Sequence, residues 1–251
     1  MRRLAAAVII LVGLLASGAA TQAFSGGTAS ALPGEPPPTI PAYFWMATSN
    51  GSVFDQSGRP GQYGSADGSP LNAPVVGLAA APFGSGYWLV AGDGGVFTYG
   101  SAGFFGSMGG QYLNAPVVGM ANTGDGGGYW LVAADGGVFS YGDANFYGSA
   151  GGTHLNAPVV GIAATPNGGG YWLVAADGGV FSYGDAGFYG SKGGQTLTAP
   201  MTGIAPTPYG SPGGYSIVGS DGSWYEFGPG GDAFASPFSS SVMGIVAVWY
   251  G

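Results

Sequence analysis

Asparagine and aspartate side chains recur along this chain at fixed intervals, and they are the groups best suited to bind a ligand. Each of these asparagines is followed by Ala-Pro, and each of the aspartates by Gly-Gly. Amides and carboxylates repeated in this way could hydrogen-bond a hydroxyl-rich polymer, where many weak contacts act together. With a tyrosine and the single histidine of the intervening loops, the candidate ligand-binding residues are Asn72, Asn114, Asn156, Tyr112, His154, Asp93, Asp135 and Asp177.

Each candidate also has a purely structural interpretation. Aspartate in a tight turn accepts hydrogen bonds from its own backbone, and we favour this role over a carboxylate ring that binds a cation. Asparagine ahead of Ala-Pro could simply begin an extended strand. His154 stands at a loop position that Tyr112 and Thr196 fill in other copies, so we favour an incidental surface residue over a general base.

The sequence does not contain a convincing catalytic or metal-binding arrangement. Glycoside hydrolysis needs two carboxyl groups flanking one sugar bond, about 5–9.5 Å apart. The expected inner strands, such as APVVGIA at 157–163, contain no acid, and Glu35 and Glu226 have no partner in view. A calcium loop concentrates several oxygen ligands in one segment, and the nearest approach, Asn122 to Asp125, is weak. We therefore predict a protein that is not an enzyme and has no cofactor.

Aromatic residues recur at the same interval and could serve either packing or sugar stacking. Large flat side chains at one repeated strand position suit sheet-to-sheet packing, which we favour for the strand aromatics. These are Trp45, Trp88, Trp130, Trp172, Phe54, Phe97, Phe139 and Phe181. Aromatic residues expected near the rim are better candidates for stacking on sugar rings: Tyr63, Phe105, Tyr112, Tyr147 and Tyr189.

All of these spacings follow from a 42-residue repeat. LNAP begins at Leu71, Leu113 and Leu155, and LTAP begins at Leu197. Such a period indicates stacked units that cannot bury their apolar faces alone. The copy at 155–196 has four short runs broken by Gly, Pro, Asn and Asp, which predicts a four-stranded antiparallel meander with a two-residue Asp-Gly hairpin.

The fold class that fits these units is all-β: a five-bladed β-propeller of four-stranded antiparallel blades. The first strand of each blade should be innermost, because it has the smallest side chains. The first blade lacks this strand, whereas a final Gly-Ile-Val strand at 244–246 lacks a blade. We therefore predict that the C-terminal strand pairs into the first blade and closes the ring. The Asn loops and Asp hairpins would then emerge on one face.

The chain divides into three parts. Residues 1–23 have two arginines, a short apolar core and small residues, which predicts a secretory signal peptide; an uncleaved anchor is the alternative. Residues 24–40 form a Pro/Gly-rich linker. The propeller spans 41–251, as repeats 41–70 plus 242–251, 71–112, 113–154, 155–196 and 197–241. Cysteine is absent, so there are no disulfides.

The sequence GYWLVAADGGVFSYGDAGFYGS at 170–191 resembles the "GYWLVAxDGGVFSFGDAxFYGS" repeats of secreted actinobacterial Gly/aromatic-rich proteins. The Gly-Ile-Ala strand that opens the unit is similar to the NHL type of propeller repeat. The resemblance implies export and, in many cases, attachment to secreted hydrolases or cell-surface proteins. It implies no settled activity.

Charge restricts the partners. Without residues 1–23, the chain has two basic residues, Arg59 and Lys192, and twelve acidic residues, which gives a formal charge of −10. Such a surface disfavours nucleic acid and anionic lipid, so we predict no membrane contact after signal cleavage. We expect a monomer, secreted or in the cell envelope. Two functions stay open: a non-catalytic module that binds cell-wall or extracellular glycan, and a structural or protein-interaction module. A hydrolase is a third hypothesis, which we disfavour.

Overall fold

The computed structural model describes residues 8–11, 45–55, 63–206, 213–229 and 245–248. Every element in these ranges is a β-strand apart from one 3₁₀ turn, η1 (Pro82–Gly84). The all-β class predicted from the sequence is therefore confirmed. Within the described part of the chain, no helix has the length and apolar character needed to span a membrane.

Each of the four repeats after residue 70 forms one antiparallel sheet of three strands, in which the middle strand pairs with both neighbours. The strands are β4 (Val75–Ala80), β5 (Gly86–Ala91), β6 (Val96–Gly100); β7 (Val117–Asn122), β8 (Gly128–Ala133), β9 (Val138–Gly142); β10 (Val159–Ala164), β11 (Gly170–Ala175), β12 (Val180–Gly184); β13 (Met201–Pro206), β14 (Tyr215–Gly219) and β15 (Trp224–Phe227). In every sheet a register shift interrupts the pairing of the first and second strands at the same position, so the copies match in detail.

Two further pairs complete the described strands. β2 (Trp45–Ala47) pairs with β3 (Val53–Asp55), and the two supply the described strands of the first repeat. β1 (Val8–Leu11) pairs with β16 (Ile245–Val248), so strands from opposite ends of the chain lie side by side.

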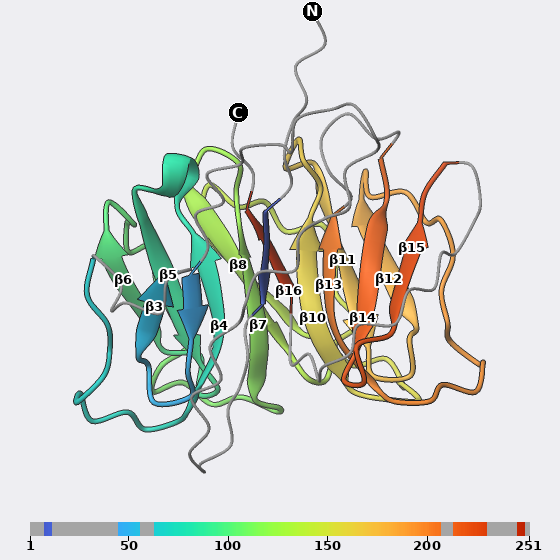
Figure 1. Ribbon diagram of the computed structural model, residues 1–251, viewed down its shortest axis with the longest axis horizontal. Coiled ribbons are helices and arrows are strands. Elements are labelled where there is room, and N and C mark those ends of the chain that lie inside the picture. Colours follow the sequence, from blue (N-terminus) through green and yellow to red (C-terminus); the bar gives the residue numbers. More distant parts are fainter. Residues whose placement is uncertain (1–7, 12–44, 56–62, 207–212, 230–244, 249–251) are drawn as a thin grey trace, which may run out of the picture.

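The four sheets stand next to one another with their first strands toward the middle of the molecule (Figure 1). β4 contacts β7, β7 contacts β10, and β10 contacts β13. Small residues permit this close approach: a Cβ placed on Gly161 would lie 3.5 Å from the Cα of Gly203. β16 continues the series, because it contacts both β13 and β4.

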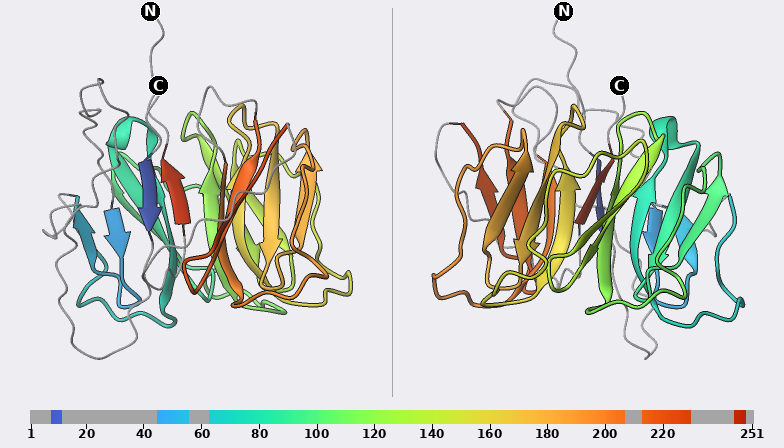
Figure 2. Two further views of the ribbon diagram at one scale, coloured as in Figure 1. Left: turned by 45° about the vertical axis from the view of Figure 1, so that its right-hand side comes forward. Right: turned by 180° about the vertical axis from the view of Figure 1, so that it is seen from behind.

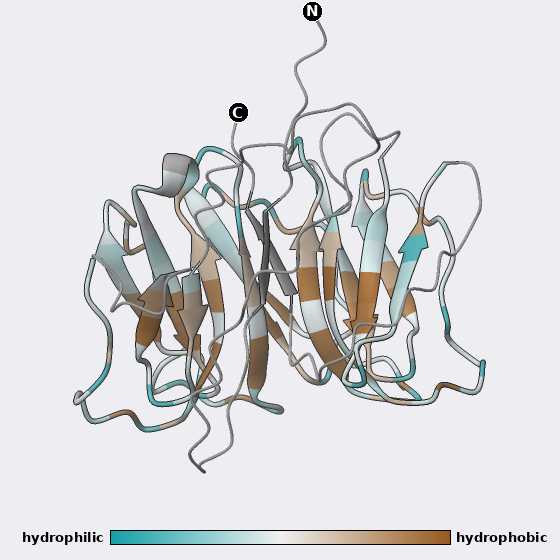
Figure 3. Ribbon diagram, in the orientation of Figure 1, coloured by the Kyte–Doolittle hydropathy of each residue, from teal (hydrophilic) through white to brown (hydrophobic). Residues whose placement is uncertain are grey.

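The middle strands form the core. Every residue of β5, β8 and β11 is buried, on both faces of the sheet, because each sheet is covered by its neighbours. Figure 3 shows apolar residues along the strands and hydrophilic residues in the turns. The packing role that we favoured for the strand tryptophans agrees with their burial: Trp45, Trp88, Trp130 and Trp172 are at most 4 % exposed.

Hydrogen bonds between successive repeats hold the sheets together. The Tyr129 hydroxyl donates to the Gly106 carbonyl at 2.5 Å and accepts from the Phe105 amide at 3.2 Å, so a tyrosine of one repeat clamps a loop of the repeat before it. Tyr171 does the same with Gly148 and Tyr147. Burial raises the pKa of the Tyr129 hydroxyl, which keeps it in the protonated, donating form.

The predicted fourth strand is not found in the three repeats between residues 71 and 196, and in the last repeat the corresponding segment, 230–241, lies outside the described residues. The segment expected to form it, such as Phe188–Tyr189, is not paired with any strand. Its backbone amide is used elsewhere: the Tyr189 N–H donates to the hydroxyl of Tyr215 in the next repeat at 3.2 Å. A side-chain contact between repeats therefore takes the donor that a fourth strand would have needed.

The pairing of the C-terminal strand into the first blade is also not observed. β16 pairs with β1 in the register Val8↔Val248 to Leu11↔Ile245, and β1 in turn contacts β2 (Figure 2, left). The β-branched run of β1 is well suited to a strand and occupies the hydrogen-bonding edge of β16. β1 lies within residues 1–23, which we predict to be a signal peptide. The sheets are thus not joined into a closed ring by the expected pair.

The predicted two-residue Asp-Gly hairpin is wrong in its length. The Ala91 amide donates to the Gly95 carbonyl at 2.9 Å and the Gly94 amide to the Ala91 carbonyl at 2.8 Å, which leaves three residues in the loop. Gly94 has φ +76°, so the loop needs a single residue in the left-handed region, and glycine supplies it. The same hydrogen bonds recur around Asp135 and Asp177.

Candidate functional site

The Asp hairpins are fixed by backbone hydrogen bonds to two Asn loops. The Gly92 amide donates to the Pro74 carbonyl of its own repeat, and the Val117 amide of the next repeat donates to the Gly92 carbonyl, both at 2.9 Å. Ala134 and Ala176 make the equivalent bonds in the following repeats. Each hairpin therefore lies between the Asn loop of its own repeat and the equivalent loop of the next one, which has Thr198 in place of asparagine in the last repeat.

Each aspartate stabilises its own turn. Oδ1 of Asp93 accepts a hydrogen bond from the Gly95 amide at 3.0 Å, and Asp135 and Asp177 accept from Gly137 and Gly179 at the same distance. This is the turn role that we favoured from the sequence. It engages Oδ1 and does not require Oδ2, so a structural and a binding role can coexist in one side chain.

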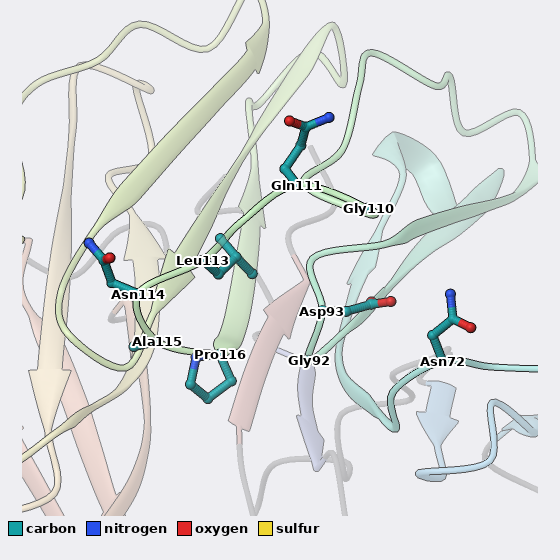
Figure 4. Close-up of a pocket in the computed structure, with 9 residues that line it drawn as sticks. All are labelled: Asn72, Gly92, Asp93, Gly110, Gln111, Leu113, Asn114, Ala115 and Pro116. Atoms are coloured by element: carbon teal, nitrogen blue, oxygen red, sulfur yellow. The ribbon is translucent and has the colours of Figure 1, made fainter.

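An open pocket of about 490 Å³ lies at the junction of the repeats 71–112 and 113–154. It is lined by Asn72, Gly92, Asp93, Gly110, Gln111, Leu113, Asn114, Ala115 and Pro116. Figure 4 shows Asn72 and Asp93 on one side and Leu113 and Asn114 on the other. The structure thus brings three predicted site residues together around one cavity, with the amide of Gln111 added to them.

The remaining Asn and Asp candidates occupy equivalent places in later repeats. Asn114 and Asp135 correspond to Asn72 and Asp93 one repeat on, and Asn156 and Asp177 correspond to them two repeats on. The three asparagines are exposed, whereas the three aspartates are half-buried in their turns.

The last repeat shows how the residues at the asparagine and aspartate positions can interact. Thr198 takes the place of the asparagine, and its hydroxyl donates to Oδ2 of Asp221 at 2.6 Å. Thr198 is the main cause of a lowered pKa of Asp221, about 2, with further hydrogen bonds from Ser223. In this copy the second carboxylate oxygen is therefore already occupied from within the chain.

We expect Thr198→Val to raise the pKa of Asp221 from about 2 toward its ordinary value. Because folding lowers this pKa, the stabilising effect of Asp221 is present above the unfolded value near 3.8 and is lost as the pH falls through about 2. Titration of the Asp221 carboxyl carbon by NMR measures the change. Thr196→Val, at an exposed loop position, is the matched control and should leave the pKa unchanged. An equal pKa in Thr198→Val and the parent chain would contradict this role of the hydroxyl.

Tyr112 and His154 do not line this pocket. Tyr112 is 87 % exposed beside Gln111, and His154 is exposed at the corresponding loop one repeat later. Of the rim aromatics, Tyr63 and Tyr147 are half-buried and donate hydrogen bonds to the carbonyls of Gly84 and Gly168 at 3.0 and 2.9 Å. These two rings also pack against buried tyrosines, so they contribute to the contacts between repeats.

Metal chemistry has no support in the described residues, where no group of three or more His, Asp or Glu side chains is placed to hold an ion. Asp143 accepts a hydrogen bond from Thr123 at 3.1 Å. In the next repeat, Asp185 accepts from Thr165 at 3.2 Å and from Asn167 at 2.6 Å. These bonds explain the carboxylates as local structure.

Sequence reasoning missed the exposed phenylalanines Phe104, Phe146 and Phe188, because it assigned their segment to a fourth strand. The sequence feature that could have identified them is the recurrence of Phe directly before Phe105, Tyr147 and Tyr189.

No protein-family model matches the chain, and no curated protein matches it.

Proposed function

We propose that this chain is a secreted, non-catalytic β-propeller module that binds glycan of the cell wall or extracellular matrix. The pocket carries this proposal, because four hydrogen-bonding side chains from two repeats line it: Asn72, Asp93, Gln111 and Asn114. Amides and carboxylates with a small apolar contribution, here from Leu113, match the hydroxyls and C–H faces of a sugar.

The architecture that we propose is five-bladed. Four equivalent sheets and the β2–β3 pair supply parts of five units, and the contacts of β16 with β13 and β4 support a fifth inner position. Removal of β1 with the signal peptide would leave β16 free to pair with β2. The segments 103–107, 145–149 and 187–191 would then act as outer edges of the blades.

The charge and the repeats narrow the ligand. A formal charge of −10 after signal cleavage disfavours acidic polymers, so neutral polysaccharides fit best. Equivalent Asn and Asp side chains at successive junctions favour a ligand with a repeated unit, because linked weak sites act together. The resemblance to secreted actinobacterial repeat proteins supports export and an envelope location.

A direct binding experiment tests this function. The full chain is passed over peptidoglycan and arabinogalactan and tested on a glycan array; we expect retention that saturates and is reversed by the free sugar. The double variant Asn72→Ala/Asn114→Ala removes two exposed amides of the pocket and should weaken retention by about tenfold, whereas Thr196→Val, outside the pocket, should not. Absence of retention on every glycan would reject the proposal.

A second function is a structural or protein-interaction module of the envelope. The inter-repeat tyrosine bonds favour it, because they recur at each junction and would suit a stiff spacer. In the same experiment, capture of one defined envelope protein without any glycan retention would select this function. Turnover of ester or glycoside substrates that is lost in His154→Ala would select the disfavoured hydrolase.

A further inference from the structure

Three phenylalanine side chains on the outside of the molecule have no packing role that explains them. Phe104, Phe146 and Phe188 are 61 %, 59 % and 60 % exposed, and each lies 42 residues from the next. Single exposed apolar residues are common on protein surfaces. A large ring that returns at the same position of three successive repeats, with the same exposure, is a regular feature instead.

The backbone on both sides of each ring is held by hydrogen bonds. Ahead of Phe146, the Asn145 carbonyl accepts from Nε1 of Trp130 at 2.7 Å. After it, the Tyr147 amide donates to the hydroxyl of Tyr171 in the next repeat at 3.2 Å. A ring presented on a fixed backbone loses little conformational freedom when it binds, so it is preorganised for a ligand.

The same two bonds fix the other rings. Around Phe104, Trp88 donates to the Gly103 carbonyl at 2.6 Å and the Phe105 amide donates to Tyr129 at 3.2 Å. Around Phe188, Trp172 donates to the Gly187 carbonyl at 2.8 Å, and the next amide donates to Tyr215 at 3.2 Å. The three rings therefore have equivalent supports and form a series.

Polar residues accompany the rings in the sequence. Asn145 directly precedes Phe146 and Asp143 lies three residues before it; both are exposed, and Ser101 and Asp185 are exposed at the positions that correspond to Asp143. A protein partner of standard size needs about 800 Å² of contact on each side, centred on a continuous apolar patch. Phe105, directly after Phe104, is also 37 % exposed, whereas Tyr147 and Tyr189 are half-buried, so each position exposes one or two rings. Such small aromatic surfaces with polar neighbours in the sequence match a sugar, which has an apolar C–H face and a rim of hydroxyls.

We propose that Phe104, Phe146 and Phe188 are stacking platforms for sugar rings of a neutral polysaccharide. This inference rests on the proposed glycan binding and adds a second surface to it. Each phenylalanine follows the end of the third strand that lies away from the Asp hairpin, so these platforms are separate from the pocket of Asn72 and Asp93.

The test compares three triple variants at positions 104, 146 and 188 with the parent chain, with arabinogalactan as the probe. Replacement of all three residues by leucine keeps apolar side chains but removes the rings, and should raise the dissociation constant by about tenfold or more. Replacement by tyrosine restores a stacking ring and should bring the constant to within about threefold of the parent value. Replacement by alanine should weaken binding as leucine does. The unfolding midpoint of each variant confirms that the fold is retained.

The possible results separate the phenylalanine platforms from the proposed glycan binding. Unchanged binding of the leucine variant, together with a loss in Asn72→Ala/Asn114→Ala, would overturn the platforms and leave the proposed function standing. No binding by the parent chain would reject both. Tyrosine variants as weak as the leucine ones, or loss of an envelope protein partner in place of the polysaccharide, would show that the rings do not act by stacking on sugar.

Discussion

Trp130→Ala is expected to lower the free energy of unfolding by about 3–5 kcal/mol, the range for removing a large aromatic side chain from a core. The indole is fully buried and lies against Tyr171, with ring centroids 5.6 Å apart. Its Nε1 also donates a hydrogen bond to the Asn145 carbonyl at 2.7 Å, and the substitution would leave this carbonyl without that donor. Urea denaturation followed by circular dichroism measures the change.

Phe146→Ala is the matched control, because it removes an aromatic ring from the same repeat at a site that is 59 % exposed. This change should alter the free energy of unfolding by no more than about 0.5 kcal/mol. Similar losses in the two variants would mean that burial between the repeats is not what makes Trp130 important. They would also remove Phe146 from consideration as a ligand platform, since it would then serve stability.

Deletion of residues 242–251 is the second large change. It removes β16, which contacts β13 on one side and β4 on the other. In a repeat array each unit is supported only by its neighbours, so an unsupported end opens locally. We expect amide hydrogen exchange in β4 and β13 to accelerate by about 100-fold or more, while exchange in β8 changes much less. Exchange measured by NMR or mass spectrometry resolves the strands.

Removal of residues 249–251 alone leaves β16 intact and provides the control. It should leave exchange in β4 and β13 close to that of the parent chain. If the longer deletion has no greater effect than this one, β16 does not join the last sheet to the first, and a five-bladed ring is excluded.

The parts of the fold that follow from repetition could be predicted from the sequence. A period of 42 residues with apolar residues on both faces of YWLVAA required stacked sheets, and the middle strands are buried on both sides. The same periodicity placed Asn72, Asp93 and Asn114 on one face, where the structure has them around one pocket. Their role in binding stays a prediction.

The errors arose where side chains determine what the backbone does. Propensity favoured a strand at Phe188–Tyr189, but the hydroxyl of Tyr215, from another repeat, takes the Tyr189 amide. No local pattern contains that contact. The hairpin at Asp93 differs by one residue, because Asp-Gly is compatible with more than one loop length.

The pairing of β16 with β1 makes the final sheet depend on whether residues 8–11 are still part of the chain. A polypeptide that retains residues 8–11 and one that has lost them cannot have the same final sheet, because β1 lies against β16 in the first and is missing from the second. If residues 1–23 are removed as the proposed signal peptide, the position beside β2 becomes vacant and β2 and β16 can meet there. Under that proposal the last sheet forms only after cleavage, so processing and completion of the fold are coupled.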